Sequence, residues 1–327
     1  MAMKIDSYTL ARMVGVSQAT VSRAFSRPDK VSATTRRKIM EAAERLGYVP
    51  DRHASALRRQ GTSTIVLLYI HRDDTHYWTN IRRNHWILAE AVLSLTRFFE
   101  TLPYHLEIRN VDSVFSVNPS LMQDHCDGVI VFDFVSEEEA KAIHDWEIPY
   151  VLCHRSGHLA EYNHSATDNV AGGRLQSRHL IAQGAKNPAY IMNREDPFSH
   201  PLRVKGFAES YPNVRIIDED QREATSSLVL KSISEGEIDG LAFVNDTLLV
   251  QTISDISAAG VQILPKLPVI GYDNSTVLMV LDEKPASIEI GIADIYRNAA
   301  AALIELIKEE QSRISIVHEP TLVLPFE

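Results

Sequence analysis

Residues 15–25 have the sequence GVSQATVSRAF, the pattern of a tight turn that leads into a helix. Gly15 suits the left-handed backbone that ends a preceding helix, which we expect over Ser7–Val14. Ser17 then offers its hydroxyl to the free amides at the start of the next helix. Two short helices joined in this way are typical of a helix-turn-helix, whose second helix lies in the major groove of DNA. A plain surface turn between two amphipathic helices is the alternative.

The second helix of this pattern has two distinct faces. Positions i, i+1, i+4 and i+5 share one face, which here carries Gln18, Ala19, Ser22 and Arg23. The opposite face is apolar, and its Val21, Ala24 and Phe25 are expected to pack on Leu10, Ala11 and Val14. A short polar face that ends in arginine suits contact with base edges. We therefore predict DNA contacts from this face and from two residues at the start of the helix, Ser17 and Thr20.

A third helical segment completes a small helical domain, which we place at residues 1–50. Ser32 is positioned to cap the segment, Gly47 to end it and Pro50 to stop it. Between these signals, apolar side chains recur at helical spacings at Ile39, Ala42, Ala43 and Leu46.

The charge of the chain divides at about the same point. Residues 1–62 carry a net charge of +7 and the remaining residues carry −17, which gives −10 for the 327 residues. A basic head on an acidic body is expected when only the head meets phosphate groups. Solvated helix faces would explain either value alone, but they explain the division poorly.

These features resemble the lactose-repressor (LacI) family of bacterial transcription regulators. Residues 4–62 resemble the DNA-binding head of that family, and the matching stretch is LARMVGVSQATVSRAFSRPDKVSATTRRKIMEAAERLGYVPDRHASALRRQGT. The resemblance continues in the same order through CDGVIVF, IPYVL, TDNVAGG, LRVKGF, FVNDTLL and VIGYDN, so it covers nearly the whole chain. The resemblance implies a cytoplasmic homodimer that represses transcription from a palindromic operator and responds to a small molecule, often a sugar.

A linker over residues 51–62 joins the head to the rest of the chain. Its helix-compatible part is too short to be stable alone in water. The resemblance implies that this hinge folds when two copies pair over the operator, and we place Ser55 and Leu57 at the DNA. A leucine at the position of Leu57 would then wedge into the minor groove and kink the duplex. A solvated tether with an incidental leucine is the alternative.

From Thr64 onward apolar runs alternate with amphipathic helical stretches. The predicted strands are Ile65–Ile70, Gly128–Phe132, Pro149–Leu152, Ala189–Met192, Val214–Ile217, Leu241–Val244 and Val269–Gly271. The predicted helices are Asn80–Phe99, Glu137–Asp145, Asn169–Gln183, Leu202–Glu209, Thr247–Ala259 and Ala293–Lys308. Such alternation indicates parallel sheets covered on both faces. The stretch Val111–Gln123 leaves room only for a shortened element before the strand at Gly128.

The predicted fold is a small all-α helix-turn-helix head followed by an α/β body. The resemblance implies that residues 63–327 form two Rossmann-like, periplasmic-binding-protein-like lobes with parallel sheets. We place the N-lobe at about 63–156 and 291–316, and the C-lobe at about 157–290 and 317–327. Ligands of such folds bind at the carboxyl ends of the strands, so the effector is expected between the lobes.

Seven residues near predicted strand ends form the candidate effector site. The resemblance places an arginine at Arg203, where a planar five-donor group would hold hydroxyls or carboxylates. An amide and a carboxylate can recognise neighbouring hydroxyls as donor and acceptor, and Asn245 and Asp273 follow strands. The other members are Tyr77, Trp78, His154 and Phe198. The alternatives are a structural ion pair between Arg203 and Asp273, a helix cap at Asn245 and a core position for Trp78.

The site departs from the family pattern in ways that leave the ligand open. His154 stands where relatives often carry aspartate, Ile290 where a polar residue is common, and the loop His71–His76 lacks the usual Asn-Pro. Sugars, sugar acids and sugar phosphates all remain candidates. The histidines His71, His76 and His85 have no recognisable ligand spacing with a carboxylate or cysteine partner, so we predict neither a metal nor a cofactor.

Other classes of protein fit the sequence less well. It lacks a Gly-x-Ser-x-Gly nucleophile motif, a phosphate loop and a Gly-x-Gly-x-x-Gly after the first strand, so we do not expect an enzyme. We expect no signal peptide and no membrane span, and we expect reduced structural thiols at Cys126 and Cys153. A secreted sugar-binding protein would need an export signal and would have no helix-turn-helix. A regulator that answers to a protein partner stays open as an alternative.

Overall fold

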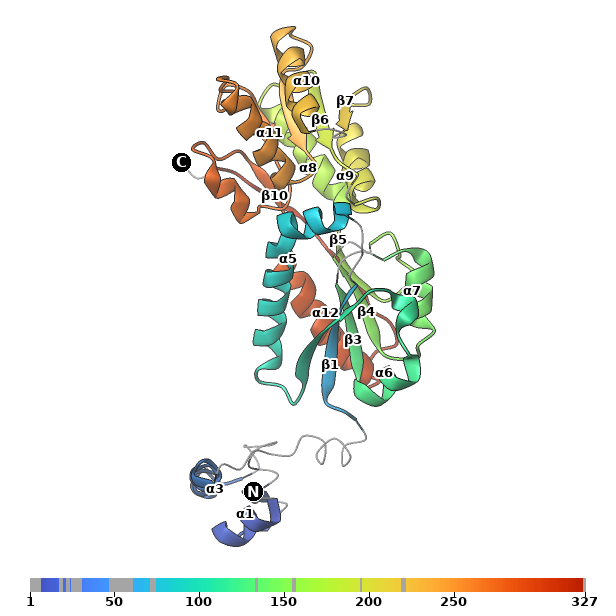
Figure 1. The fold of residues 1–327 in the computed structure, drawn as a ribbon, viewed down its shortest axis with the longest axis vertical. Coiled ribbons are helices and arrows are strands. Elements are labelled where there is room, and N and C mark those ends of the chain that lie inside the picture. Colours follow the sequence, from blue (N-terminus) through green and yellow to red (C-terminus); the bar gives the residue numbers. More distant parts are fainter. Residues whose placement is uncertain are drawn as a thin grey trace.

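The structure is a computed structural model (Figure 1). It describes residues 7–17, 20, 21, 24, 31–46, 61–70, 75–132, 135–154, 157–194, 196–218 and 222–325. No helix among these residues is both long enough and apolar enough to cross a membrane.

The helical head has the turn that the sequence predicts. Helix α1 spans Ser7–Val14, as expected, and Gly15 follows it with a φ of 76°. The amides of Gly15 and Val16 both donate to the carbonyl oxygen of Ala11 at 3.0 Å, which ends the helix and reverses the chain. Ser17 then accepts a hydrogen bond from the amide of Thr20 at 3.1 Å, so it caps the next turn as predicted.

The three segments of the head share one small apolar core. Helix α3 spans Ala33–Leu46, and the Ser32 hydroxyl accepts from the amide of Thr35 at 3.2 Å. The predicted packing is confirmed for the described side chains, since the core consists of Leu10, Ala11, Val21, Ala24, Ile39, Ala42 and Ala43. Phe25, Gly47 and Pro50 lie outside the described residues.

The N-lobe is built on a six-stranded sheet with strand order β11-β5-β4-β3-β1-β2, and every pairing is parallel. In chain order the strands are β1 (Thr64–Ile70), β2 (His105–Val111), β3 (Gly128–Phe132), β4 (Tyr150–His154), β5 (His164–Thr167) and β11 (Ser315–His318). Alternate residues of β1 point to opposite faces of the sheet. Ile65 and Leu67 belong to one core cluster, and Val66 and Leu68 belong to another.

Helices cover both faces of this sheet (Figure 1). On the face of Ile65 and Leu67 lie α5 (Thr75–Phe99) and α12 (Ile292–Ile307). The other face carries the short 3-10 helix η2 (Val114–Ser116), α6 (Pro119–His125) and α7 (Glu137–His144). Helix α6 has seven residues, which is the shortened element expected there.

The C-lobe is built on a second parallel sheet with strand order β7-β6-β8-β9. Its strands are β6 (Pro188–Met192), β7 (Arg215–Asp218), β8 (Gly240–Phe243) and β9 (Val269–Ile270). Helix α8 packs against α9 and α10 against α11. These helices span Asn169–Ala182, Ser199–Ala208, Arg222–Ser234 and Asp246–Ala258. The 3-10 helix η3 (Thr276–Val280) follows, and the short strands β10 (Ser287–Glu289) and β12 (Thr321–Val323) pair antiparallel.

The chain crosses between the lobes later than the boundary predicted at residue 157. Strand β5 pairs with β4, so the N-lobe sheet extends to Thr167. The sequence HSAT of β5 carries no apolar run, which is why the strand was not predicted. Its hydroxyls are nevertheless bonded, since Ser165 donates to the carbonyl of Ile295 at 2.9 Å and Thr167 donates to that of Ile290 at 3.2 Å. A polar strand can be buried when its hydroxyls find such partners.

Helices α8 and α9 approach closely because a glycine lies on each of them. A Cβ atom at Gly173 would lie 2.0 Å from the carbonyl oxygen of Arg203, and one at Gly206 would lie 2.0 Å from that of Val170. Only glycine leaves room for this contact. It brings the middle of α9 against α8 and so fixes where the Arg203 side chain begins.

Candidate functional site

Arg203 is the centre of a buried polar cluster in the C-lobe. It is 3% exposed, and its Nε donates to Oδ1 of Asn169 at 2.9 Å. Its Nη1 donates to the carbonyl oxygen of Val244 at 2.6 Å and lies 3.3 Å from Oδ1 of Asp273. The guanidinium carbon also lies 3.8 Å from the ring centroid of Tyr272. These contacts join α8, α9 and the ends of β8 and β9 at one cation.

Asp273 lies in a turn that departs from ordinary backbone geometry. Its φ is 99° and that of Asn274 is 46°, values that residues other than glycine seldom adopt. The amide of Asp273 donates to the carbonyl of Ile288 at 2.7 Å, so β10 helps to hold the turn. Such strained backbone clusters at ligand sites when the surroundings over-determine it.

The fully buried carboxylate of Asp246 organises the same turn. Its Oδ1 accepts from the amide of Tyr272 and from the hydroxyl of Ser287, both at 2.8 Å, and its Oδ2 accepts from the amide of Ser275 at 2.7 Å. Burial and the nearby carboxylate of Asp273 raise the pKa of Asp246 well above its usual value, against the effect of these hydrogen bonds. A Cβ at Gly271 would lie 1.9 Å from Oδ1, so the carboxylate occupies the space that the glycine leaves.

Asn245 is the cap of helix α11. Its Oδ1 accepts from the amide of Leu248 at 2.8 Å, and the side chain is 3% exposed. The preceding residue, Val244, supplies the carbonyl that Arg203 contacts, so Asn245 lies next to the cluster along the chain. The structure thus contains both the ion pair between Arg203 and Asp273 and the helix cap at Asn245, which are the structural alternatives to a ligand site. A contact of this kind does not prevent the same groups from binding a ligand.

The remaining predicted effector residues come from other segments of the chain. His154 is 4% exposed at the end of β4 with a φ of 68°, so it belongs to the N-lobe. Phe198 immediately precedes α9, and its ring stacks on that of His158. Tyr77 and Trp78 lie in the first turn of α5, because this helix begins at Thr75 rather than at the predicted Asn80.

Several residues of the cluster were not singled out from the sequence. Asn169, Tyr272 and Asp246 all lie inside motifs that carry the resemblance, TDNVAGG, GYDN and FVNDTLL. A polar residue directly beside a predicted site residue was the available signal for Tyr272 and Asp246. Outside the cluster, the stacking of His158 on Phe198 had no such signal, because the two residues lie forty positions apart in the chain.

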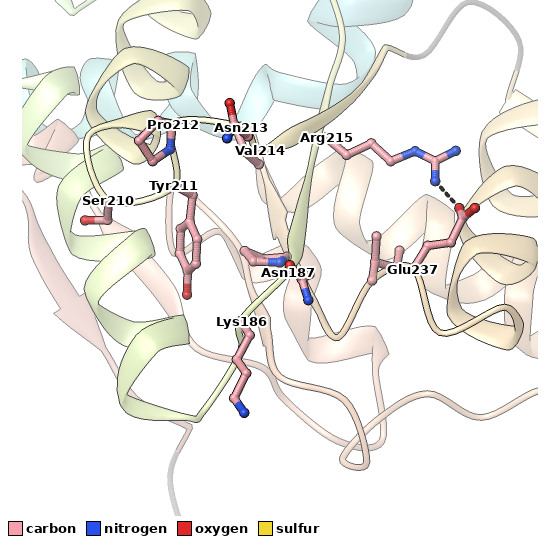
Figure 2. Close-up of a pocket in the computed structure, with 11 residues that line it drawn as sticks. Lys186, Asn187, Ser210, Tyr211, Pro212, Asn213, Val214, Arg215 and Glu237 are labelled. Carbon is pink, nitrogen blue, oxygen red and sulfur yellow. Dashed lines mark hydrogen bonds and ion pairs between the residues drawn. The ribbon is translucent and has the colours of Figure 1, made fainter.

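A pocket of about 400 Å³ lies elsewhere in the C-lobe (Figure 2). Its lining includes Pro188 and Arg215, the first residues of β6 and β7, so it lies at the amino ends of the strands. The ion pair of Arg215 with Glu237 forms part of its wall. None of the seven predicted effector residues lines it. We therefore do not assign the effector to this pocket.

The described part of the head presents a basic surface. Its exposed basic residues are Arg12, Arg36, Arg37, Lys38 and Arg45. Among the predicted DNA contacts, Ser17 is exposed, and its hydroxyl lies 2.8 Å from that of Thr20. The other predicted contacts lie outside the described residues; they are Gln18, Ala19, Ser22, Arg23, Ser55 and Leu57.

The two cysteines are buried and form no disulfide. Burial raises the pKa of the Cys126 thiol to about 11 and raises that of Cys153 as well. Among the described residues there is no group of three or more histidine, cysteine, aspartate or glutamate side chains placed to hold a metal ion.

Two family models match the chain. One, described as bacterial regulatory proteins of the lacI family, matches residues 8–51, and the other, described as a periplasmic binding protein-like domain, matches residues 177–324. The chain belongs to the LacI family. As a LacI-family member it is a regulatory protein and not an enzyme.

Curated relatives align with the LacI-family chain from end to end. Catabolite control protein A of Priestia megaterium is 26% identical over 333 residues, which cover 97% of each chain. The HTH-type transcriptional regulator GalR of Salmonella typhimurium is 26% identical over 327 residues, which cover 96% of this chain and 93% of that protein. The HTH-type transcriptional repressor PurR of Vibrio parahaemolyticus is 24% identical and covers 96% of each chain.

Solved structures of the LacI family share the fold. A Lac repressor dimer bound to operator and the anti-inducer ONPF has a TM-score of 0.75 at 18% identity, covering 99% of this chain and 98% of that one. The transcriptional regulator CelR in complex with cellobiose has a TM-score of 0.68 at 22% identity, covering 98% and 99%. The predicted fold class, a helix-turn-helix head with a two-lobed parallel α/β body, is confirmed.

Proposed function

We propose that this LacI-family protein is a transcriptional repressor whose operator affinity depends on a small molecule bound between its two lobes. The observation that carries the proposal is the combination, on one chain, of a helix-turn-helix head with a two-lobed body of the periplasmic-binding type. The relatives named as regulators and repressors align along the whole length of the chain, which supports the same conclusion. The protein acts in the cytoplasm as a homodimer on a palindromic operator, in line with the operator-bound Lac repressor dimer.

The head reads DNA in this proposal. Ser17, Gln18, Ala19, Thr20, Ser22 and Arg23 supply the major-groove contacts, and Ser55 and Leu57 supply contacts at the centre of the operator. The apolar core beneath the second helix supports its position, since Val21 and Ala24 are buried against α1 and α3. The net charge of +7 over residues 1–62 favours approach to phosphate while the acidic body is repelled.

The effector is a sugar or a sugar derivative in this proposal, and its contacts are Tyr77, Trp78, His154, Phe198, Arg203, Asn245 and Asp273. Nε and Nη1 of Arg203 are engaged inside the C-lobe, so we assign Nη2 to the effector. The strained turn at Asp273 holds its carboxylate beside the same guanidinium, with Oδ1 3.3 Å from Nη1. A donor and an acceptor side by side suit neighbouring hydroxyl groups of a sugar. The CelR structure holds cellobiose, which supports a sugar as the ligand class.

The effector controls DNA affinity by shifting the balance between two arrangements of the lobes. A ligand can shift such a balance only through contacts that differ between the two states. Its proposed contacts belong to different lobes, since His154 ends strand β4 of the N-lobe and Arg203 lies on helix α9 of the C-lobe. A ligand that touches both therefore favours one distance between them, and the head-bearing N-lobes of the dimer respond.

Two measurements test the proposal. The first is a thermal-shift screen of sugars, sugar acids and sugar phosphates that includes cellobiose and ribose. A true effector at a hundred times its dissociation constant adds about 2.7 kcal/mol to the free energy of unfolding. The second is selection of bound duplexes from a random pool, followed by titration of the selected operator with and without the effector. Failure to select any sequence would overturn the DNA-binding function. Operator affinity that responds only to undialysed cell extract would point to a protein co-effector.

A further inference from the structure

The ring of His158, from the N-lobe, stacks on the ring of Phe198, from the C-lobe. Their centroids lie 3.9 Å apart and their planes are inclined by 3°, which is a close parallel stack. His158 follows β4 of the N-lobe sheet, and Phe198 precedes α9 of the C-lobe. Both side chains are half-buried. The stack is therefore a contact between the lobes at the carboxyl ends of their strands.

The chain next to each ring is anchored in its own lobe. On the N-lobe side, the neighbour of His158 is Leu159, which is 2% exposed and belongs to the core of that lobe. The carbonyl of Leu159 also accepts from the amide of Tyr162 at 3.0 Å, which closes a tight turn. His158 thus lies beside an anchored turn, and its imidazole contacts the other lobe.

Phe198 is anchored through its backbone. The amides of Phe198 and Ser199 both donate to Oδ1 of Asp196 at 2.9 Å, and Asp196 is 1% exposed. This arrangement fixes the first turn of α9, the helix that also carries Arg203. When α9 moves relative to the N-lobe, the Phe198 ring and the proposed effector contact Arg203 therefore move together.

We propose that the His158–Phe198 stack is a latch that favours the closed arrangement of the lobes. The inference rests on the proposed function, in which the cleft between the lobes receives the effector. The stack exists only when the lobes are close, so it contributes to the closed state and not to the open one. It also covers one face of Phe198, and an effector that stacks on that face must displace His158.

The strength of a single aromatic pair sets the size of the effect. Such pairs shift an equilibrium by about two- to tenfold beyond the burial of their area. Loss of the latch therefore lowers the ratio of closed to open molecules by about this factor. This lower ratio changes the effector concentration that is needed to shift the equilibrium between the closed and open states.

The test measures the distance between the lobes without DNA or effector. Dyes are attached to two exposed sites, Glu138→Cys in α7 of the N-lobe and Lys205→Cys in α9 of the C-lobe. Both helices lie on the right of the view in Figure 1. The native Cys126 and Cys153 are buried and are poor targets for labelling. Single-molecule energy transfer then gives the ratio of closed to open molecules in the full-length protein.

Four variants and one control decide the outcome. We expect His158→Ala and Phe198→Ala each to lower the closed-to-open ratio about two- to tenfold, and the double variant to lower it no further. His158→Phe keeps a stacking ring and retains the ratio. Phe115→Ala removes a 66% exposed aromatic ring elsewhere in the N-lobe and is the matched control. If His158→Ala does not fold, His158→Gln replaces it.

Effects of the two single variants that add in the double variant, or an unchanged ratio in both, would overturn the latch. If the closed-to-open ratios change as expected but the protein binds no operator, the proposed function is overturned and the latch is not. The two failures are therefore distinguishable.

Discussion

Arg203 of α9 and Asp273 after β9 form an ion pair inside the C-lobe, with Nη1 3.3 Å from Oδ1 and side chains only 4% and 8% exposed. Burying this pair removes two charges from water, which is unfavourable, and contacts with neighbouring groups offset the loss of hydration. Asn169 and the carbonyl of Val244 accept from the guanidinium, and the ring of Tyr272 lies over it. The same arrangement can be a structural element or the base of a ligand site, and substitutions separate the two roles.

Asp273→Ala separates sensing from folding. We expect it to abolish the effect of the effector on operator affinity and to leave effector-free operator binding within about twofold, because no DNA-contacting surface changes. The free energy of unfolding falls by about 2–3 kcal/mol, since Arg203 keeps two of its acceptors. Operator titrations with and without effector, run beside urea unfolding, measure both quantities. A purely structural role is indicated if operator binding and stability are lost together.

Arg203→Lys tests whether the guanidinium geometry matters or only its charge. Lysine retains the charge opposite Asp273, but a single ammonium cannot reproduce the separate hydrogen bonds that Nε and Nη1 donate to Asn169 and Val244. We expect loss of the effector response and a fall of about 1–3 kcal/mol in the free energy of unfolding. Lys205→Arg, an exposed change two positions later, is the control. An unchanged effector dissociation constant in Arg203→Lys would contradict the assignment of Nη2 to the ligand.

The sequence predicts the strands that are apolar throughout and misses those that are not. Runs such as Gly128–Phe132 are buried on both faces of the sheet, so hydrophobicity marks them directly. Strand β2 lies at the sheet edge, where HLEIRNV mixes polar and apolar residues because its side chains are partly exposed. Strand β5 is polar yet buried, because distant carbonyls of Ile295 and Ile290 satisfy its hydroxyls. Such partners become visible only when the chain is folded.

The sequence indicates where candidate effector residues lie along the chain, but it does not give their contacts. Asn245 and Asp273 follow strands β8 and β9 at one edge of the sheet, whereas Arg203 lies within helix α9. The pairing of Arg203 with Asp273 depends on how closely α9 approaches α8, and this distance is set by Gly173 and Gly206. Periodicity locates a helix, but it does not give the separation of two helices.

Gly173→Ala tests this dependence of the site on helix packing. The new methyl would lie 2.0 Å from the carbonyl oxygen of Arg203 and 2.8 Å from the amide nitrogen of Phe207, so α9 must move away. We expect the free energy of unfolding in urea to fall by about 3 kcal/mol or more. Gly236→Ala is the matched control, because its φ of 68° is strained for alanine but no atom lies within 4 Å of the new methyl. That control should cost about 1–2 kcal/mol, and equal costs for both variants would contradict the packing argument.

The pH dependence of stability has a contribution from His318 in β11. Burial lowers the pKa of His318 below its ordinary value, and its Nε2 lies 3.0 Å from the hydroxyl of Ser165. The unfolded chain therefore binds the proton more readily than the folded protein, so this contribution is present near pH 7 and is lost as the pH falls below about 6.5. We expect the stability of His318→Asn to decline less than that of the wild type between pH 7 and pH 5. Parallel curves in urea titrations would contradict this expectation.

Arginines of the head can contact either the phosphate groups or the base edges of DNA, and the two kinds of contact can be measured separately. Affinity for the selected operator should fall with salt at a log–log slope of about −0.9 for each phosphate neutralised, because bound counterions are released. Arg23→Ala should cost about 1–3 kcal/mol and relax the preference at one base pair, because a bidentate arginine distinguishes guanine from the other bases. The control is Arg37→Ala in α3, whose exposed guanidinium lies 3.9 Å from Glu41 and is not a predicted base contact.

The salt slope and the base preference decide between two roles for Arg23. A base contact leaves the slope nearly unchanged and alters the ranking of operator variants, whereas a phosphate contact lowers the slope by about one and weakens every sequence alike. Anisotropy titrations of the selected operator and its single-base variants at several salt concentrations measure both. We expect the first pattern for Arg23→Ala and no change in ranking for Arg37→Ala. A slope near zero in the wild type would remove the basis for DNA binding altogether, because a head with a net charge of +7 cannot bind a phosphate backbone without releasing counterions.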